Sequence, residues 1–336
     1  MPAAEPAAAP AASPAPLPPT APLARHTGTP ADGWLLAGDA AFESDDFGKA
    51  ETSYKEAKAL AQTDPAPLVG LARVMVAKTN VATDYNAAPR NPMLISAATL
   101  LRQAVKLDAR FAPAYTELGR VQLILGKADE ALTSLRKAVE LASADPEAHS
   151  CLGVGLLAIG RADEAVSELA RAAELDPGSA PRQTNLGTAL LMRGRVPESI
   201  KAYENAARMA PGDARTLSDL GTALLADNQL QRAIGVLKSA IAIDPKRAAL
   251  HSNLGYALQQ ARDFPGAIAE YRAAIALDDR MVSAWVNLGT ALAQTGERAE
   301  AERALQHAQK IDPSDPRVRA NLEELHTMGR KDTPKK

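Results

Sequence analysis

Residues 185–190 read NLGTAL; the same six letters return at 287–292, and a near copy, DLGTAL, lies at 219–224. The three stretches begin at positions 185, 219 and 287, so both intervals between them are whole multiples of 34. Self-similarity at such a fixed period is the signature of a chain built from copies of one supersecondary unit. We therefore expect a repeat fold in which the glycine of each stretch marks an equivalent place.

The same period extends from residue 31 to residue 315. Counted from the first residue of each copy, position 8 is glycine in seven of the eight copies, and position 27 is alanine in all eight. The second copy is longer than the others because of an insertion at about 79–92. The eight copies span 31–64, 65–111, 112–145, 146–179, 180–213, 214–247, 248–281 and 282–315.

Each copy carries the apolar pattern of two amphipathic helices. Positions 4, 7, 8 and 11 share one face of a first helix, and positions 20, 24, 27 and 30 share a face of a second. A glycine inside a helix costs about 1 kcal/mol relative to alanine, so its return at position 8 indicates a steric need. We expect the small alanines at positions 20 and 27 to be the matching surfaces, and the large apolar residue at position 30 to fill the gap toward the next copy.

The order of these positions resembles the tetratricopeptide repeat (TPR) family, whose copies read W-x-x-L-G-x-x-Y, then A-x-x-x-F-x-x-A and a proline. The chain meets this pattern at Trp285, Leu288, Gly289, Ala301, Leu305, Ala308 and Pro313. The resemblance implies an all-α fold, a right-handed α-solenoid of eight helix-turn-helix repeats over 31–315. Residues 316–330 fit a capping helix with a charged face, and 331–336 form a short tail.

Residues 1–30 consist mostly of alanine and proline, and we expect them to form a disordered leader. Proline removes main-chain donors and blocks helix formation, which favours an extended, polyproline-like tether. The alternative is a proline-rich ligand for a small recognition domain, based on the single PxxP from Pro16 to Pro19. The role of the 79–92 insertion stays open between a functional loop and a neutral one.

Composition and motifs exclude several classes of function. The net charge of −2 gives no basic excess for nucleic acid, and no apolar run is long enough to span a membrane. The single cysteine, Cys151, excludes an intrachain disulfide, and the five histidines show no metal-ligand spacing. We expect no catalytic residues, no metal and no cofactor. His149 and His251 are interpreted as packing residues, and nothing in the sequence orients a catalytic pair of Cys151 and His149.

By the resemblance, the first helices line a concave groove, with positions 2, 5, 6, 9, 12 and 13 facing a ligand. We expect a lining that is small, polar and nearly uncharged, without the lysines that some TPR domains use for acidic chaperone termini. Position 6 carries a line of asparagines similar to the ladder in the TPR superhelix of O-GlcNAc transferases, where the amides hold the backbone of an extended peptide. No residues remain here for a transferase domain.

The other interpretation of position 6 is an ordinary solvated TPR residue. On the ladder hypothesis, an asparagine can both donate to a peptide carbonyl and accept from a peptide N–H. The expected peptide-binding residues are Asn185, Asn253, Asn287, Asn321, Asp219, Thr184, Thr188, Ser218, Thr222, Ser252, Tyr256 and Thr290.

These observations predict a non-enzymatic scaffold that binds an extended peptide or protein partner in the groove. The alternative is an exported or lipid-anchored TPR component of a bacterial envelope, secretion or motility assembly, because Ala/Pro linkers often follow a signal peptide. The N-terminus lacks a signal-peptide pattern, so the expected location is cytoplasmic, or periplasmic if the true start lies upstream. Nucleic acid is not expected as a partner, and homodimerisation through the repeat surfaces stays open.

Overall fold

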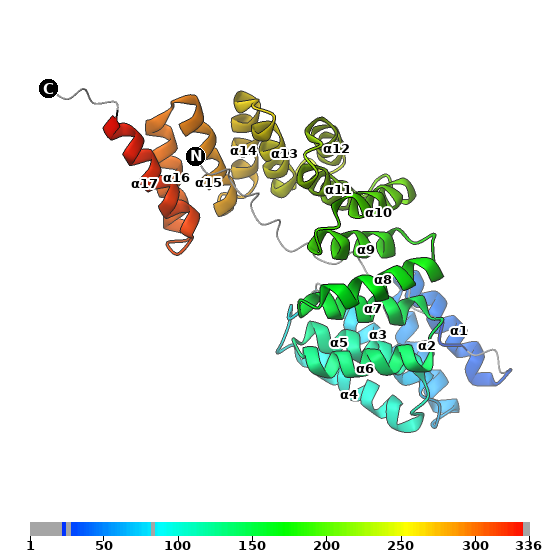
Figure 1. The fold of residues 1–336 in the computed structure, drawn as a ribbon. Coiled ribbons are helices and arrows are strands. Elements are labelled where there is room, and N and C mark those ends of the chain that lie inside the picture. The colour runs from blue at the N-terminus through cyan, green and yellow to red at the C-terminus, as the bar shows by residue number, and fades with distance from the viewer. Residues whose placement is uncertain (1–21, 25–27, 82–84, 332–336) are drawn as a thin grey trace. The chain divides into compact units, whose positions relative to one another are not determined.

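The computed structural model describes residues 22–24, 28–81 and 85–331, and all regular secondary structure in these ranges is helical. Seventeen helices follow one another in the described residues (Figure 1). Their bounds are α1 (Pro30–Glu43), α2 (Phe47–Leu60), α3 (Ala66–Lys78), α4 (Pro92–Leu107), α5 (Ala112–Ile124), α6 (Ala128–Leu141), α7 (Pro146–Ala158), α8 (Ala162–Leu175), α9 (Ala180–Met192), α10 (Val196–Met209), α11 (Ala214–Ala226), α12 (Leu230–Ile243), α13 (Ala248–Gln260), α14 (Phe264–Leu277), α15 (Val282–Thr295), α16 (Arg298–Ile311) and α17 (Pro316–Lys331).

The helices divide between two compact units. Among the described residues, the N-terminal unit ends at Arg195 and contains α1–α9, and the C-terminal unit begins at Val196 and contains α10–α17. Within each unit, the first and second helices of a repeat pack as hairpins, apart from the fifth repeat, whose α9 and α10 belong to different units. The chain therefore has the all-α repeat fold that the repeat period predicts (Figure 1). The segment expected to cap the array forms α17, whose Val318 is buried with Val286 and Ala308.

The leader predicted for 1–30 lies mostly outside the described residues. Its described part includes Leu23 and Ala24, which are buried against the N-terminal unit rather than extended in solvent. The first helix begins at Pro30, where proline is well tolerated because the first turn leaves its N–H groups unbonded. The tail at 332–336 also lies outside the described residues.

A large side chain on the second helix explains the glycine at position 8. A Cβ atom added to Gly221 would lie 2.7 Å from Leu237 Cγ, and one added to Gly255 would lie 2.8 Å from the ring of Tyr271. Leu237 and Tyr271 both occupy position 24 and are completely buried. The surface that packs against the glycine therefore includes the large residue at position 24, and not only the alanines at positions 20 and 27.

The expectation for position 30 is wrong in five of the eight repeats. The side chains there are largely exposed instead of filling the gap toward the next repeat, at Leu60, Leu107, Met209, Ile243 and Leu277. Each is the last residue of its helix. Periodicity identifies the face on which a residue lies, but it does not show that the partner helix still covers that face at the helix end.

Position 4 connects a first helix to the preceding repeat. Trp285 Nε1 donates to a main-chain carbonyl of the preceding repeat at 2.8 Å. The Nε2 atoms of His149 and His251 lie 3.0 Å from the equivalent carbonyls, while their Nδ1 atoms face Glu168 at 2.6 Å and Glu270 at 2.7 Å. The histidines thus reproduce the hydrogen bond of the indole as well as its position.

The insertion in the second repeat packs against the end of α5. The main-chain N–H groups of Asn86 and Ala88 donate to the carbonyls of Leu123 and Ile124 at 2.9 and 3.1 Å. Asn91 caps α4, because its side chain accepts main-chain N–H groups of the first turn. The described part of the insertion is therefore fixed to the neighbouring repeat.

Candidate peptide-binding surface

The expected peptide-binding residues lie on first helices of both units. Asn185, Thr184 and Thr188 belong to α9 of the N-terminal unit, and the other nine belong to α11, α13, α15 and α17 of the C-terminal unit. The position-6 line is therefore divided between two units, and each part is described within its own unit.

In the C-terminal unit, two of the asparagines bridge neighbouring repeats. Asn253 Nδ2 donates to Ser218 Oγ at 3.1 Å, and Asn321 Nδ2 donates to Thr290 Oγ1 at 3.2 Å. An amide nitrogen has two N–H groups, so each bridge uses one of them. These two side chains stabilise the stacking of repeats and keep part of their hydrogen-bonding capacity.

Other polar atoms of this line have no hydrogen-bond partner among the described residues. They are Asn287 Nδ2 and Asp219 Oδ2 in the C-terminal unit and Asn185 Nδ2 in the N-terminal unit, and Arg215 Nη2, one turn before Asp219, is in the same condition. Asn287 is 3% exposed and Asn185 is 2% exposed. A buried polar group without a partner costs about 1–3 kcal/mol, so these atoms offer a favourable gain to any ligand that bonds them.

The carboxyl of Asp219 is strongly perturbed. Burial raises its pKa from 3.8 to about 7, with a further increase from Asp213, against the opposing charges of Arg215 and Arg247. Near neutral pH this side chain therefore exchanges between a carboxylate, which accepts hydrogen bonds, and a carboxylic acid, which also donates one.

The hydroxyl groups at positions 5 and 9 mainly bond their own helices. Thr184, Thr188, Thr222 and Thr290 each donate to the carbonyl four residues earlier at 3.0–3.1 Å. The oxygen of Thr222 can still accept a hydrogen bond from a ligand N–H. Burial raises the pKa of Tyr256, the aromatic member of this set.

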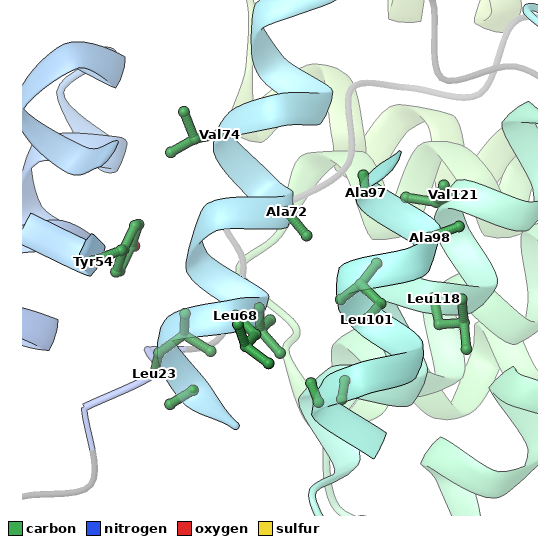
Figure 2. Packing of buried hydrophobic residues seen from close by; sticks show 14 of the residues in the cluster. Leu23, Tyr54, Leu68, Ala72, Val74, Ala97, Ala98, Leu101, Leu118 and Val121 are labelled. Carbon is green, nitrogen blue, oxygen red and sulfur yellow. The ribbon is translucent and has the colours of Figure 1, made fainter. Parts of the chain in front are cut away.

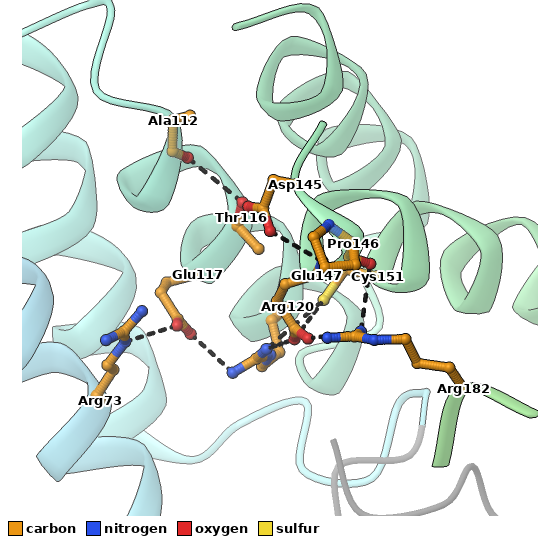
Figure 3. Close-up of polar contacts among 10 residues, drawn as sticks. All are labelled: Arg73, Ala112, Thr116, Glu117, Arg120, Asp145, Pro146, Glu147, Cys151 and Arg182. Carbon is orange, nitrogen blue, oxygen red and sulfur yellow. Dashed lines mark hydrogen bonds and ion pairs between the residues drawn. The ribbon is translucent and has the colours of Figure 1, made fainter. Parts of the chain in front are cut away.

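The first helices α3, α5, α7 and α9 of the N-terminal unit carry a row of buried charges that we call the charge row: Arg73, Glu117, Arg120, Glu147 and Arg182 (Figure 3). The signs alternate, and successive members form ion pairs from α3 to α9. Arg73 Nε lies 2.7 Å from Glu117 Oε1, and Glu117 Oε2 lies 3.1 Å from Arg120 Nη1. Arg120 Nη2 pairs with Glu147, whose second oxygen lies 3.2 Å from Arg182 Nη1.

Mutual pairing compensates for the burial of the charge row, whose five residues are all at most 8% exposed. Burial alone would raise the pKa of Glu117, but the charges of Arg120 and Arg73 outweigh it and hold that pKa below its ordinary value. A buried charge is tolerated when it is paired and hydrogen-bonded. The first helices of this unit therefore carry more charge than the nearly uncharged lining expected from the sequence.

Cys151 lies inside the charge row, with its Sγ donating to Glu147 Oε1 at 3.4 Å. Burial raises its pKa far above that of a free thiol, so the nucleophilic thiolate is disfavoured. Both ring nitrogens of His149 face other groups, Glu168 and a main-chain carbonyl. The sulfur and the imidazole do not form a catalytic pair.

Sequence reasoning missed the charge row because its members lie far apart in the chain and meet only through stacking of four first helices. One signal was present in the sequence. Arg73, Glu117 and Arg120 are charged at positions 6 and 9, where the fifth, seventh and eighth repeats carry asparagine at position 6 and threonine or tyrosine at position 9.

Within the described residues, no group of three or more histidine, cysteine, aspartate or glutamate side chains is placed to hold a metal ion. No helix in the same part of the chain is long and apolar enough to cross a membrane.

Comparison with protein families identifies this architecture. The tetratricopeptide repeat model matches residues 96–148, 116–180, 184–248 and 252–316, more than half of the chain. The chain therefore belongs to the tetratricopeptide repeat family. Proteins of this family generally mediate protein–protein interactions and are typically non-enzymatic. Comparison with curated proteins gives no match.

Solved structures with the same fold include PilF of Pseudomonas aeruginosa, which is 19% identical with a TM-score of 0.55, over 66% of this chain and 100% of that one. The Cut9–Hcn1 assembly of APC/C gives a TM-score of 0.56 at 14% identity, over 88% of this chain and 76% of that one. A TPR protein of Cytophaga hutchinsonii gives 0.52 at 16% identity, over 68% and 94%. At these identities the likeness concerns the fold.

Proposed function

We propose that the chain is a non-enzymatic interaction scaffold that binds an extended segment of a partner protein along the first helices of the C-terminal unit. The observation that carries this proposal is the set of polar atoms without partners, Asn287 Nδ2, Asp219 Oδ2 and Arg215 Nη2, on first helices of this unit. An extended peptide presents alternating N–H and C=O groups. The amide and guanidinium would donate to its carbonyls, and the carboxylate would accept its N–H groups.

The atoms themselves are covered, since Asn287 is 3% exposed, but the surface of α11 beside Asp219 is partly accessible. Asp219, Ser218 and Thr222 are half-buried, so a main chain can approach them from solvent. Main-chain hydrogen bonds impose little sequence preference, which suits recognition of an extended segment by conformation. The net charge of −2 and the polar lining favour a protein partner over nucleic acid. No observation on the described residues favours the alternative of an exported assembly component.

The test uses peptides selected from a random display library on the full wild-type chain, with affinities measured by titration calorimetry. We expect Asn287→Ala to weaken binding about 3- to 10-fold, the usual effect of one lost neutral hydrogen bond. Arg303→Ala, an exposed change on the second helix α16, serves as the matched control and should leave the affinity unchanged. The proposal fails if Arg303→Ala weakens the peptides while Asn287→Ala and Asp219→Ala do not.

A further inference from the structure

Residues of the leader are held along α1 by two aspartates. The main-chain N–H groups of Leu23 and Ala24 donate to Asp39 Oδ2 at 2.7 and 3.2 Å, and the N–H of Gly28 donates to Asp32 Oδ2 at 3.0 Å. Asp32 and Asp39 are two helical turns apart, so they share a face of α1 about 10 Å apart along its axis. Gly28 bonds an aspartate near the N-terminus of α1 and Leu23 bonds one two turns further on, so the described residues of the leader follow α1 in the antiparallel sense.

The side chain of Leu23 provides an apolar anchor for this segment. It is 1% exposed and belongs to the same buried cluster as Leu68 and Tyr54 (Figure 2). Ala24 is buried beside it at 8%. Bonds to main-chain N–H groups are independent of sequence, whereas a pocket filled by leucine selects an apolar residue.

The acceptor for the segment is oriented by the protein core. Asp39 Oδ1 accepts a hydrogen bond from the Tyr54 hydroxyl at 2.8 Å, which leaves Oδ2 for the two N–H groups. Tyr54 is completely buried, and its ring lies so close to Gly38 and Gly70 that an added Cβ at either would come within 2.5 Å of it. The carboxylate is therefore held in place from behind by the first two repeats, and binding needs little reorganisation of it.

These contacts have the form of peptide recognition. Asp32 and Asp39 occupy positions 2 and 9 of the first repeat, which are among the positions expected to face a ligand. We propose that the face of α1 with Asp32, Asp39 and the Leu23 pocket is a binding site for an extended, leucine-bearing segment, and that the chain's own leader occupies it. A partner segment of the same chemistry then binds only after the leader leaves.

The competition can be quantified. A tethered segment acts at an effective concentration of order 1 mM. For a free peptide with a dissociation constant of about 0.1 mM, the leader therefore reduces the apparent affinity about tenfold. Release of the leader should therefore raise the apparent affinity by the same factor.

The probe is a fluorescein-labelled peptide of residues 18–28, PPTAPLARHTG, titrated by anisotropy against full-length variants. We expect Leu23→Asp in the protein, which expels the leader, to bind the peptide about tenfold more tightly than wild type does. Adding Asp39→Asn should weaken this binding at least fivefold. Adding Glu43→Gln instead, the same loss of charge at an exposed site one turn away on α1, should not change it.

If the contacts of the leader only stabilised the fold, the result would differ, because the face of α1 would then not bind an added peptide. The proposal is overturned if Leu23→Asp binds the peptide no better than wild type, or if Asp39→Asn and Glu43→Gln have equal effects. Hydrogen exchange followed by mass spectrometry provides a second readout that needs no added peptide. Asp39→Asn in the otherwise wild-type chain should speed exchange at Leu23 and Ala24 while α1 stays protected, and unchanged exchange at these residues would contradict the proposal. Neither result bears on Asn287 or Asp219, which belong to the other unit.

Discussion

Replacement of Asp219 by asparagine should stabilise the chain at pH 8 and not at pH 4. Burial raises the pKa of this carboxyl from 3.8 to about 7, and its Oδ2 has no hydrogen-bond partner among the described residues. At pH 8 the folded chain therefore holds a partly desolvated carboxylate, with one oxygen unbonded, that the unfolded chain would expose to water. Asparagine fits the site sterically, because Asn253 and Asn287 occupy the same position in the next two repeats.

The magnitude follows from linkage. A pKa that moves from 3.8 to about 7 is worth at most about 4 kcal/mol at about 1.4 kcal/mol per pKa unit. The side chain is half-buried, so solvent screening reduces the expected effect to about 2 kcal/mol. Because the folded pKa is raised, the contribution of the aspartate is fully present below pH 3.8 and is lost as the pH rises through 7. The asparagine variant avoids that loss, so its advantage grows between about pH 4 and 7 and is constant above about pH 8.

The assay is urea unfolding followed by far-ultraviolet circular dichroism at several pH values. We expect the midpoint of Asp219→Asn to exceed that of wild type by several tenths of a molar at pH 8 and by much less at pH 4. Asp279→Asn, which removes an exposed carboxylate of the same unit, is the control and should give little change at either pH. An equal shift at both pH values, or a loss of stability at pH 8, would refute the argument.

Two further predictions concern packing and the charge row. Gly221→Ala should lower the free energy of unfolding by about 1–3 kcal/mol, because the new Cβ would lie 2.7 Å from Leu237 Cγ. Gly235→Ala should raise it by about 0.5–1 kcal/mol, because nothing lies within 4 Å of the new Cβ. Thermal melts of both variants test this contrast. Glu117→Gln should cost about 3 kcal/mol or more because it leaves buried arginines unpaired, while Arg136→Ala, which breaks an exposed ion pair, should cost less than about 1 kcal/mol. Equal urea midpoints for the last two variants would contradict the assigned role of burial.

The sequence predicts the fold well because the core positions of every repeat have the same kind of neighbour. Gly221 faces Leu237 and Gly255 faces Tyr271, so one steric requirement recurs from repeat to repeat and is visible as a constant spacing within the chain. The helix ends were harder to predict. Leu60 has the periodicity of a core residue but is 56% exposed, since periodicity carries no information on where the covering helix stops.

The hydrogen bonds of polar side chains on the first helices are less predictable, because their partners come from other repeats. Asn253 and Asn287 are the same residue at the same position, yet the Nδ2 of the first is bonded to Ser218 and that of the second has no partner among the described residues. The hydrogen bond from the Leu23 N–H to Asp39 likewise could not be predicted from the sequence, since composition alone favours an extended leader. A repeat period fixes which face a side chain lies on, but not what it meets there.

The two units differ in how completely their polar groups are bonded, and this affects where a partner gains the most binding free energy. In the N-terminal unit the charges of Glu117 and Glu147 are paired with arginines of neighbouring helices, and a ligand that bonded them would first have to compete with those pairs. In the C-terminal unit Asn287 Nδ2 and Asp219 Oδ2 have no such partners among the described residues. A ligand that bonds these atoms removes an existing cost of about 1–3 kcal/mol for each instead of exchanging one bond for another. A ligand bonded to these atoms on α11 and α15 therefore gains more than one that must replace the ion pairs of Glu117 on α5 and Glu147 on α7, which favours the proposed placement of the partner on the C-terminal unit.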